Sequence, residues 1–218
     1  IIKLELPFDR DLLRKECDEY ILPASVPLNI LTAKAIKAGL KGWDSFTGIP
    51  GTLGGSVCMN AGTSKGEIGS IVKNVKVFRK EILDYEYLTM NGSEFEYRKN
   101  LFLNEGDIIT SVTLTHLGID KTLGEKIKSY LKHRTETQPL WEKTCGCTFK
   151  NLKSGQDTCA AGRVIDILGL KGLSHKSLKV SKKHGNFIEN TGEATKKDYL
   201  ELIDIINSKV LESNGYEF

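Results

Sequence analysis

The sequence contains 218 residues (24.2 kDa), of which 39% are hydrophobic and 27% charged, and its 31 basic and 28 acidic side chains leave a net charge of +3. This near balance gives no support to a nucleic-acid partner, and no apolar stretch reaches the ~20 residues of a membrane helix. We therefore expect neither a nucleic-acid nor a membrane partner. The length allows one large globular domain or two small ones. Because the first residue is Ile and no leader pattern follows, we expect the chain to begin within a longer protein.

The cysteines form an odd set without the spacing of a disulfide framework: Cys17, Cys58, Cys145, Cys147 and Cys159. This usage is typical of reduced thiols, so we expect a cytoplasmic protein. Cys145-Gly146-Cys147 lacks the second pair that a zinc site needs, and we predict no metal site.

The first half of the chain predicts mainly short strands around one helix. Seven of the 23 residues in 47–69 are glycine, which excludes a regular amphipathic element and predicts a loop shaped by its backbone. In chain order we expect a strand, a short helix and a strand over 1–24, a helix from Pro27 to a stop at Gly39, that loop, and strands over 71–79, 82–89 and 107–116.

The second half is richer in helices. The polar residues 118–121 predict a domain boundary. We then expect a helix over 122–134, a turn at 138–141, a helix over 157–168, extended structure over 178–189, and a last helix that starts at a Thr195–Asp198 capping box and ends at Gly215. The pattern predicts an α+β protein with two lobes, 1–117 and 118–218.

The glycine-rich segment fits neither common nucleotide loop. It has no Lys after its last glycine, as a P-loop requires, and no G-x-G-x-x-G spacing that opens a helix after a strand. Small residues let backbone amides approach a phosphate or a flat ring closely. They are equally compatible with a tight structural turn, and composition alone leaves both readings open.

Residues 48–62, Gly-Ile-Pro-Gly-Thr-Leu-Gly-Gly-Ser-Val-Cys-Met-Asn-Ala-Gly, resemble the flavin-contacting segment of UDP-N-acetylenolpyruvoylglucosamine reductases. The resemblance covers nearly the whole chain from about residue 25. With 48 residues between Arg98 and Cys147, the chain is similar to the shorter, second type of the family. Three further blocks agree in the family's order: Tyr97-Arg98, residues 145–151, and residues 161–172 together with 184–188.

The resemblance implies a fold and a reaction. Residues 1–117 would be the second lobe of a two-lobed, vanillyl-alcohol-oxidase-like FAD-binding fold, and residues 118–218 a mixed α+β substrate-binding domain. NADPH would reduce FAD, which passes hydride to the enolpyruvyl group of UDP-N-acetylglucosamine enolpyruvate. The product would be UDP-N-acetylmuramate, a peptidoglycan precursor. We expect a monomer.

The resemblance also implies residue roles. Arg98 would engage the substrate carboxylate, because a guanidinium offers a planar fork of donors. Cys147 would donate a proton, with Cys145 the weaker candidate. The implied FAD-contacting residues are Ile49, Pro50, Gly51, Thr52, Gly54, Gly55, Met59, Asn60 and Gly62, and the implied substrate-binding residues are Tyr97, Arg134, Gln138, Lys150 and Asn151.

The chain also departs from the family pattern. Nothing before residue 25 resembles its pyrophosphate-binding loop. The family's catalytic glutamate stands in a leucine-glutamate-x-glutamate strand after the last helix, and residues 215–218 do not match that form, so we expect neither Glu212 nor Glu217 to take that role. Two alternatives stay open: a UDP-sugar-binding relative without redox activity, and another flavoprotein oxidase with the same FAD fold. The four histidines have neither triad order nor metal-ligand spacing, and we expect them to be structural or exposed.

Overall fold

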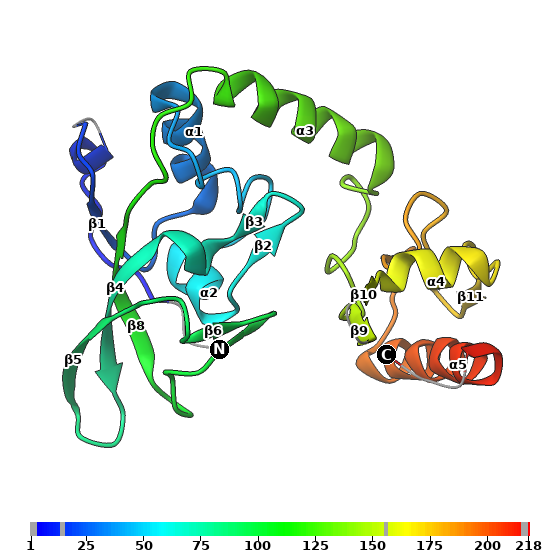
Figure 1. The fold of residues 1–218 in the computed structure, drawn as a ribbon. Coiled ribbons are helices and arrows are strands. Elements are labelled where there is room, and N and C mark those ends of the chain that lie inside the picture. Colours follow the sequence, from blue (N-terminus) through cyan, green and yellow to red (C-terminus); the bar gives the residue numbers. More distant parts are fainter. Residues whose placement is uncertain (1–3, 14–15, 155–156, 215–217) are drawn as a thin grey trace. The chain divides into compact units, whose positions relative to one another are not determined.

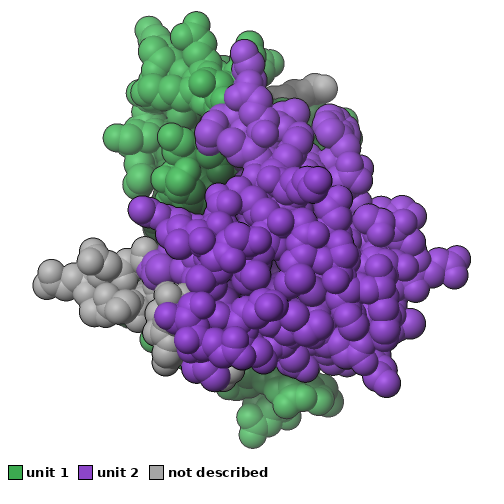
Figure 2. Space-filling view, turned by 90° about the vertical axis from the view of Figure 1, so that its right-hand side faces the viewer, with its two compact units in different colours: residues 1–131 green, residues 132–218 purple. Residues whose placement is uncertain are grey.

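The structure of the protein, a computed structural model, describes residues 4–13, 16–154, 157–214 and 218. The chain divides into two compact units, residues 1–131 and 132–218 (Figures 1 and 2). Both units combine helices with antiparallel strands, so the predicted α+β class is confirmed. Among the described residues, no helix is long and apolar enough to cross a membrane.

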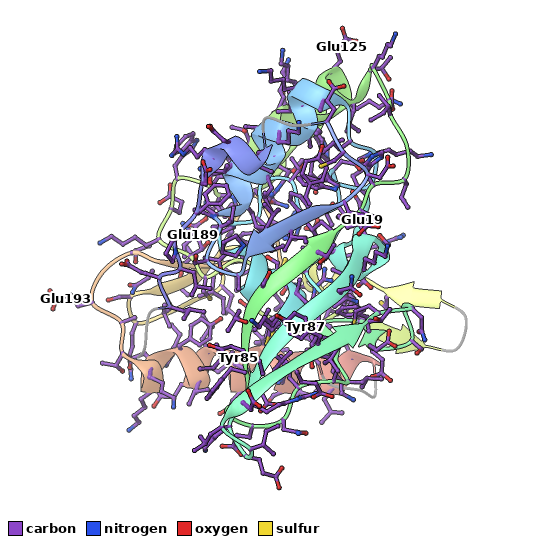
Figure 3. All side chains as sticks on the ribbon, turned by 90° about the vertical axis from the view of Figure 1, so that its left-hand side faces the viewer. Glu19, Tyr85, Tyr87, Glu125, Glu189 and Glu193 are labelled. Carbon is purple, nitrogen blue, oxygen red and sulfur yellow. The ribbon has the colours of Figure 1, made fainter. Side chains whose placement is uncertain are left out.

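Unit 1 is built on a four-stranded antiparallel sheet in the order β1-β8-β4-β5 (Figure 1). The outer strand β5 exposes Tyr85 and Tyr87 on one face (Figure 3). The strands predicted at 71–79, 82–89 and 107–116 are thus confirmed within two residues. The elements of this unit are η1 (Arg10–Leu13), β1 (Tyr20–Pro23), α1 (Leu28–Ala38), α2 (Leu53–Cys58), β2 (Gly62–Thr63), β3 (Gly66–Glu67), η2 (Ile68–Ile71), β4 (Val72–Arg79), β5 (Asp84–Thr89), β6 (Phe95–Glu96), β7 (Lys99–Asn100), β8 (Ile108–Leu114) and the first part of α3 (Leu123–Thr137).

The predicted boundary at 117/118 is wrong for the compact units, which divide at 131/132. Segment 118–121 pairs with the end of α1: Leu40 and Ile119 form a β-bridge, and the Asp120 amide donates to the Gly39 carbonyl at 2.8 Å. The start of α3 then buries Leu123 in the core of unit 1. Polar composition therefore marked a turn between two elements of one unit.

Gly39 ends α1 as predicted, in the left-handed conformation (φ +68°). A Cβ at this position would lie 2.5 Å from the Asp120 carbonyl oxygen, so glycine is required for the close approach as well as for the turn.

Two predictions in unit 1 need correction. Residues 47–69 are not all loop, because α2 forms over 53–58 with Leu53 and Val57 buried. Apolar residues four positions apart are enough to anchor this short helix to the core. At the N-terminus, residues 4–9 form no regular element, whereas the short helix and strand predicted after them are present as η1 and β1.

Unit 2 packs α4 against α5 and a small antiparallel sheet, β11-β12-β13. The Thr195–Asp198 capping box is confirmed: the Asp198 amide donates to Thr195 Oγ1 at 3.2 Å, and the Thr195 amide donates to Asp198 Oδ2 at 2.8 Å. The predicted stop at Gly215 lies outside the described residues. The elements here are the end of α3, β9 (Leu152–Ser154), β10 (Asp157–Cys159), α4 (Ala161–Ile167), β11 (Ser174–His175), β12 (Leu178–Val180), β13 (Ile188–Asn190) and α5 (Lys196–Asn214).

Two predictions in unit 2 also need correction. The helix predicted over 157–168 is shorter, because residues 157–159 pair with β9 as β10 before α4 begins. The extended segment 178–189 is two antiparallel strands, β12 and β13, separated by a turn region. Strand pairing decided both: β10 pairs with β9, which lies before the predicted helix, and β12 pairs with β13 within the predicted extended segment.

Candidate functional site

The glycine-rich segment is tied to the strand-to-helix connection at residues 24–28. The Leu53 amide donates to the Val26 carbonyl and the Gly54 amide to the Ala24 carbonyl, both at 2.8 Å. The Gly55 amide donates to Thr52 Oγ1 at 3.4 Å. These three amides, for which the sequence left both ligand contact and a structural turn open, are therefore engaged within the protein.

The predicted cofactor-contacting residues differ in exposure. Gly54 and Asn60 are buried, Ile49 and Gly62 are half-buried, and the remaining five are exposed: Pro50, Gly51, Thr52, Gly55 and Met59. A Cβ at Gly54 would lie 2.7 Å from the Ala24 Cβ, whereas one at Gly51 would meet nothing within 4 Å. Gly54 is thus a packing glycine and Gly51 a surface one.

A cavity of about 800 Å³ adjoins this segment in unit 1. Its wall includes Thr52, Gly54 and Gly55, together with residues 24–27 and 107–109. Small side chains along such a wall leave room for a flat ring to approach the backbone.

Arg98 contacts the end of the glycine-rich segment 48–62. Tyr97 and Arg98 form the two-residue turn between β6 and β7, where Arg98 takes φ +56°, a conformation more usual for Gly or Asn. Arg98 Nη2 donates to the Gly62 carbonyl at 2.8 Å, and Nη1 donates to the Asn60 carbonyl at 3.3 Å. The Tyr97 ring centroid lies 4.7 Å from the guanidinium carbon. Two separate sequence blocks therefore meet in one site.

Glu67 completes this site, although no sequence motif pointed to it. Its carboxylate accepts from Arg98 Nη1 at 3.2 Å through one oxygen and from Asn60 Nδ2 at 2.8 Å through the other. Gly62 and Glu67 are register partners in the β2–β3 hairpin, which explains why Arg98 reaches both. The available signal was an acidic residue within a run of glycines and small side chains.

Asn60 connects these groups from below the surface. It is 1% exposed and adopts φ +41°, a conformation that asparagine tolerates. Besides Glu67, Nδ2 donates to the Glu96 carbonyl at 2.9 Å, and Oδ1 accepts from the Gly69 amide at 3.1 Å. Its side chain therefore fixes the position of the Arg98 site relative to the fold.

In unit 2, Cys147 is exposed on a segment held by Asn186. Cys147 forms a β-bridge with Phe187, and the Thr148 amide donates to the Asn186 carbonyl at 2.8 Å. The Asn186 side chain accepts from the Phe149 amide at 2.8 Å and donates to the Phe149 carbonyl at 2.9 Å. The backbone after Cys147 is therefore fixed, while Cys147 itself is an exposed residue.

The remaining predicted substrate-binding residues belong to unit 2. Arg134 Nε donates to Gln138 Oε1 at 2.9 Å at the end of α3, and Lys150 is exposed. Asn151 Oδ1 accepts from the Ala161 amide at 3.2 Å, so this side chain stabilises the start of α4. Arg134 and Gln138 are brought together, whereas Asn151 has a structural contact.

His184 is half-buried and structural, as expected. Its Nδ1 accepts from the Asn186 amide at 3.2 Å, and its ring meets Phe187 edge-on. Burial and the nearby Lys171 lower the pKa of His184. In the part of the chain that the structure describes, no group of three or more His, Cys, Asp or Glu side chains could hold a metal ion.

Comparison with known proteins identifies the family. The profile of the UDP-N-acetylenolpyruvoylglucosamine reductase C-terminal domain matches residues 138–218. The reductase of that name from Thermotoga maritima is 36% identical over 201 residues, which cover 92% of this chain and 69% of the relative. The chain belongs to the UDP-N-acetylenolpyruvoylglucosamine reductase family. The family resemblance inferred from the four blocks is thereby confirmed.

Other members of the reductase family agree. The Chlamydia pneumoniae reductase is 37% identical over 179 residues, covering 82% of this chain and 57% of that relative. The crystal structure of the Thermus caldophilus reductase matches with a TM-score of 0.76 and 34% identity, covering 94% of this chain and 73% of that one. The chain thus spans 57% to 69% of the length of the two curated relatives named here.

Proposed function

We propose that this chain reduces UDP-N-acetylglucosamine enolpyruvate to UDP-N-acetylmuramate in peptidoglycan precursor synthesis, with FAD as its cofactor and NADPH as the reductant. The observation that carries the proposal is the Arg98 guanidinium bonded to the Gly62 carbonyl. This contact joins a cation suited to a carboxylate to the segment that resembles a flavin site. We further propose that the first lobe binds FAD and the second lobe binds the substrate, with the boundary between them at 131/132.

The residues of unit 1 fit a flat ring better than a phosphate. Pro50, Gly51, Thr52, Gly55 and Met59 are exposed, and the surface at Gly51 is open. The amides of residues 53–55 already have acceptors, so they would not hold a pyrophosphate. FAD, when bound, would supply hydride transfer. We assign these exposed residues to the ring and Gly54 and Asn60 to the shape of the backbone beneath it.

Arg98 would bind the substrate carboxylate and stabilise the negative charge that grows there as hydride adds to the double bond. Charge-assisted hydrogen bonds of this kind contribute roughly 1.5–3 kcal/mol each. The contacts with Gly62, Asn60 and Tyr97 orient the guanidinium before substrate arrives. A donor that is already oriented loses little entropy on binding.

Cys147 would then protonate the adjacent carbon. A cysteine thiol can donate a proton and is a stronger acid than a serine hydroxyl. Its exposure makes the proton accessible. The rest of the substrate would be bound by Tyr97, Arg134, Gln138 and Lys150. Asn151 would contribute indirectly, by stabilising the start of α4. The cytoplasmic location and the monomeric state remain predictions.

The test begins with a visible absorption spectrum and an intact mass of one purified sample, followed by NADPH consumption with and without the enolpyruvyl UDP-sugar. We expect a flavin band and NADPH consumption that depends on the UDP-sugar. Binding of the UDP-sugar without NADPH consumption would identify a non-catalytic relative. NADPH consumption by a flavin-containing sample at the same rate with and without the UDP-sugar would identify another flavoprotein oxidase.

A further inference from the structure

The segment that carries Cys147 is contacted on both sides by one phenol. Tyr199 Oη donates to Thr148 Oγ1 at 3.1 Å and lies 3.3 Å from Cys145 Sγ. Thr148 directly follows Cys147, and Cys145 stands two residues before it. The Tyr199 hydroxyl therefore contacts one residue before and one residue after the proposed proton donor.

Tyr199 itself has a firm position. It lies in the first turn of α5, directly after the Thr195–Asp198 capping box, and its ring packs against the core of unit 2. Burial and the contact with Cys145 raise the pKa of Tyr199 to about 12. The phenol thus keeps the proton that it donates to Thr148 throughout the neutral range.

The backbone before Cys147 is held at Lys143, whose carbonyl accepts from the Asn190 amide at 2.9 Å, and by the Gly146 amide, which donates to Thr144 Oγ1 at 3.3 Å. Asn186 holds Thr148 and Phe149, as described above. Gly146 takes φ +86°, and a Cβ there would meet nothing within 4 Å. A cavity of about 390 Å³, lined in part by residues 143–145, adjoins the same stretch. The space beside Gly146 is therefore open, and the Tyr199 hydroxyl, carried by a helix, supplies one of the fixed contacts of this stretch.

We propose that Tyr199 is a positioning residue that sets the orientation of the Cys147 segment through Cys145 and Thr148. The alternative is a tyrosine that merely fills the space between α5 and the loop. The geometric claim stands on the contacts alone, whereas its effect on turnover rests on the proposed function, in which Cys147 supplies a proton.

The geometric claim is tested by alkylating the thiols with iodoacetamide in Tyr199→Phe, which keeps the ring and removes only the hydroxyl. Trypsin cuts after Lys143 and Lys150, so one peptide holds both Cys145 and Cys147, and fragmentation distinguishes them. Cys17, in unit 1 and exposed, serves as the internal reference. We expect the alkylation rates of Cys145 and Cys147 to rise about threefold or more, because the segment loosens.

The matched control is Tyr87→Phe, the same chemical change on the exposed strand β5 (Figure 3). It should leave both rates and turnover unchanged. Rates in Tyr199→Phe that equal those of the wild type relative to Cys17 would overturn the proposal. Should Tyr199→Phe fail to fold, Thr148→Val and Cys145→Ala each remove one partner of the hydroxyl. Each should raise the alkylation rate of Cys147, and unchanged rates in both would overturn the proposal equally.

Turnover gives the second readout. In Tyr199→Phe we expect kcat for the UDP-sugar to fall about 10- to 100-fold, while flavin reduction by NADPH keeps its rate, because only the proton donor is misplaced. An unchanged kcat with faster alkylation would mean that Tyr199 positions the Cys147 segment but has no effect on turnover, which would refute the second half of the proposal. If the wild type itself shows no UDP-sugar-dependent turnover, the proposed function fails, and the alkylation rates still decide the role of Tyr199.

Discussion

Arg98 and Glu67 form an ion pair, with Arg98 Nη1 3.2 Å from Glu67 Oε1, although the side chains belong to a turn and a strand 31 positions apart in the sequence. Both side chains are partly exposed, so a ligand can reach the guanidinium. In the proposed reaction, the substrate carboxylate therefore has to share Arg98 with Glu67.

Glu67→Gln tests this competition. Removing the charge should lower KM for the UDP-sugar about two- to fivefold, the strength of a partly exposed ion pair. Steady-state kinetics would measure it, with Glu96→Gln as the control, because Glu96 is exposed and its carboxylate pairs with Lys99 instead. A KM that rises would mean that Glu67 orients Arg98 and does not compete for it.

Arg98→Lys keeps the charge and loses the planar fork. We expect kcat/KM to fall about 10- to 150-fold, equivalent to one charge-assisted hydrogen bond, with flavin reduction by NADPH retained. Arg79→Lys is the matched control in the same unit. Arg79 pairs with Glu86 and Asp107, so its replacement should lower the thermal midpoint and spare kcat/KM. Equal kinetic effects of both changes would argue for a purely structural Arg98.

Cys147→Ala should abolish turnover of the UDP-sugar without slowing the reduction of flavin by NADPH, because only the proton donor is removed. Stopped-flow measurement of the flavin band separates the two half-reactions. Cys145→Ala, two residues away, should retain turnover at a reduced rate because Cys145 helps to hold the segment. Full activity of Cys147→Ala would exclude Cys147 as the donor.

Alanine substitutions at the neighbouring residues Gly54 and Gly55 should have opposite effects on the stability of unit 1. At Gly54 a Cβ would lie 2.7 Å from the Ala24 Cβ, so Gly54→Ala should destabilise unit 1. At Gly55 the nearest atom is Thr52 Oγ1 at 3.5 Å, and alanine in a helix is favoured by about 1 kcal/mol. Gly55→Ala should therefore keep or raise the thermal midpoint while weakening FAD binding. Flavin content per folded protein measures this, and an unchanged content would remove Gly55 from the proposed ring surface.

Two carboxylates with lowered pKa values, Asp198 in unit 2 and Asp120 in unit 1, predict that the protein loses stability in acid. Lys176, together with the amide and hydroxyl of Thr195, holds the pKa of Asp198 well below its usual range. Such a group stabilises the fold above its unfolded pKa of about 3.9, and this contribution is lost as pH falls towards the folded value. Lys126 and Thr122 similarly lower the pKa of Asp120 in unit 1 to about 2.

Thermal midpoints measured from pH 7 to pH 3 should be flat above about pH 5 and fall below about pH 4. In Asp198→Asn the midpoint should already be lower at pH 7 and fall less steeply in acid. Asp204→Asn, on the exposed face of the same helix, should follow the wild type. An identical acid slope in wild type and Asp198→Asn would show that Asp198 makes no pH-dependent contribution.

Local features of the chain were predictable from sequence because neighbouring residues produce them. The stop at Gly39 and the Thr195–Asp198 capping box each depend on a few consecutive residues, and the main strands of unit 1 follow from alternation within one segment. The family resemblance also required only short ordered blocks. Arg98 and Cys147 could therefore be nominated from sequence.

Only the tertiary structure decided how these residues are used. Glu67 joins the Arg98 site through the pairing of β2 with β3, the amides of residues 53–55 are engaged by residues 24–26 or by Thr52, and Tyr199 reaches Cys145 across 54 positions. The boundary at 131/132 likewise depends on Leu123 entering the core of unit 1. Most of these contacts form between residues far apart in the chain, and their geometry depends on how strands and helices pack, which no local pattern encodes.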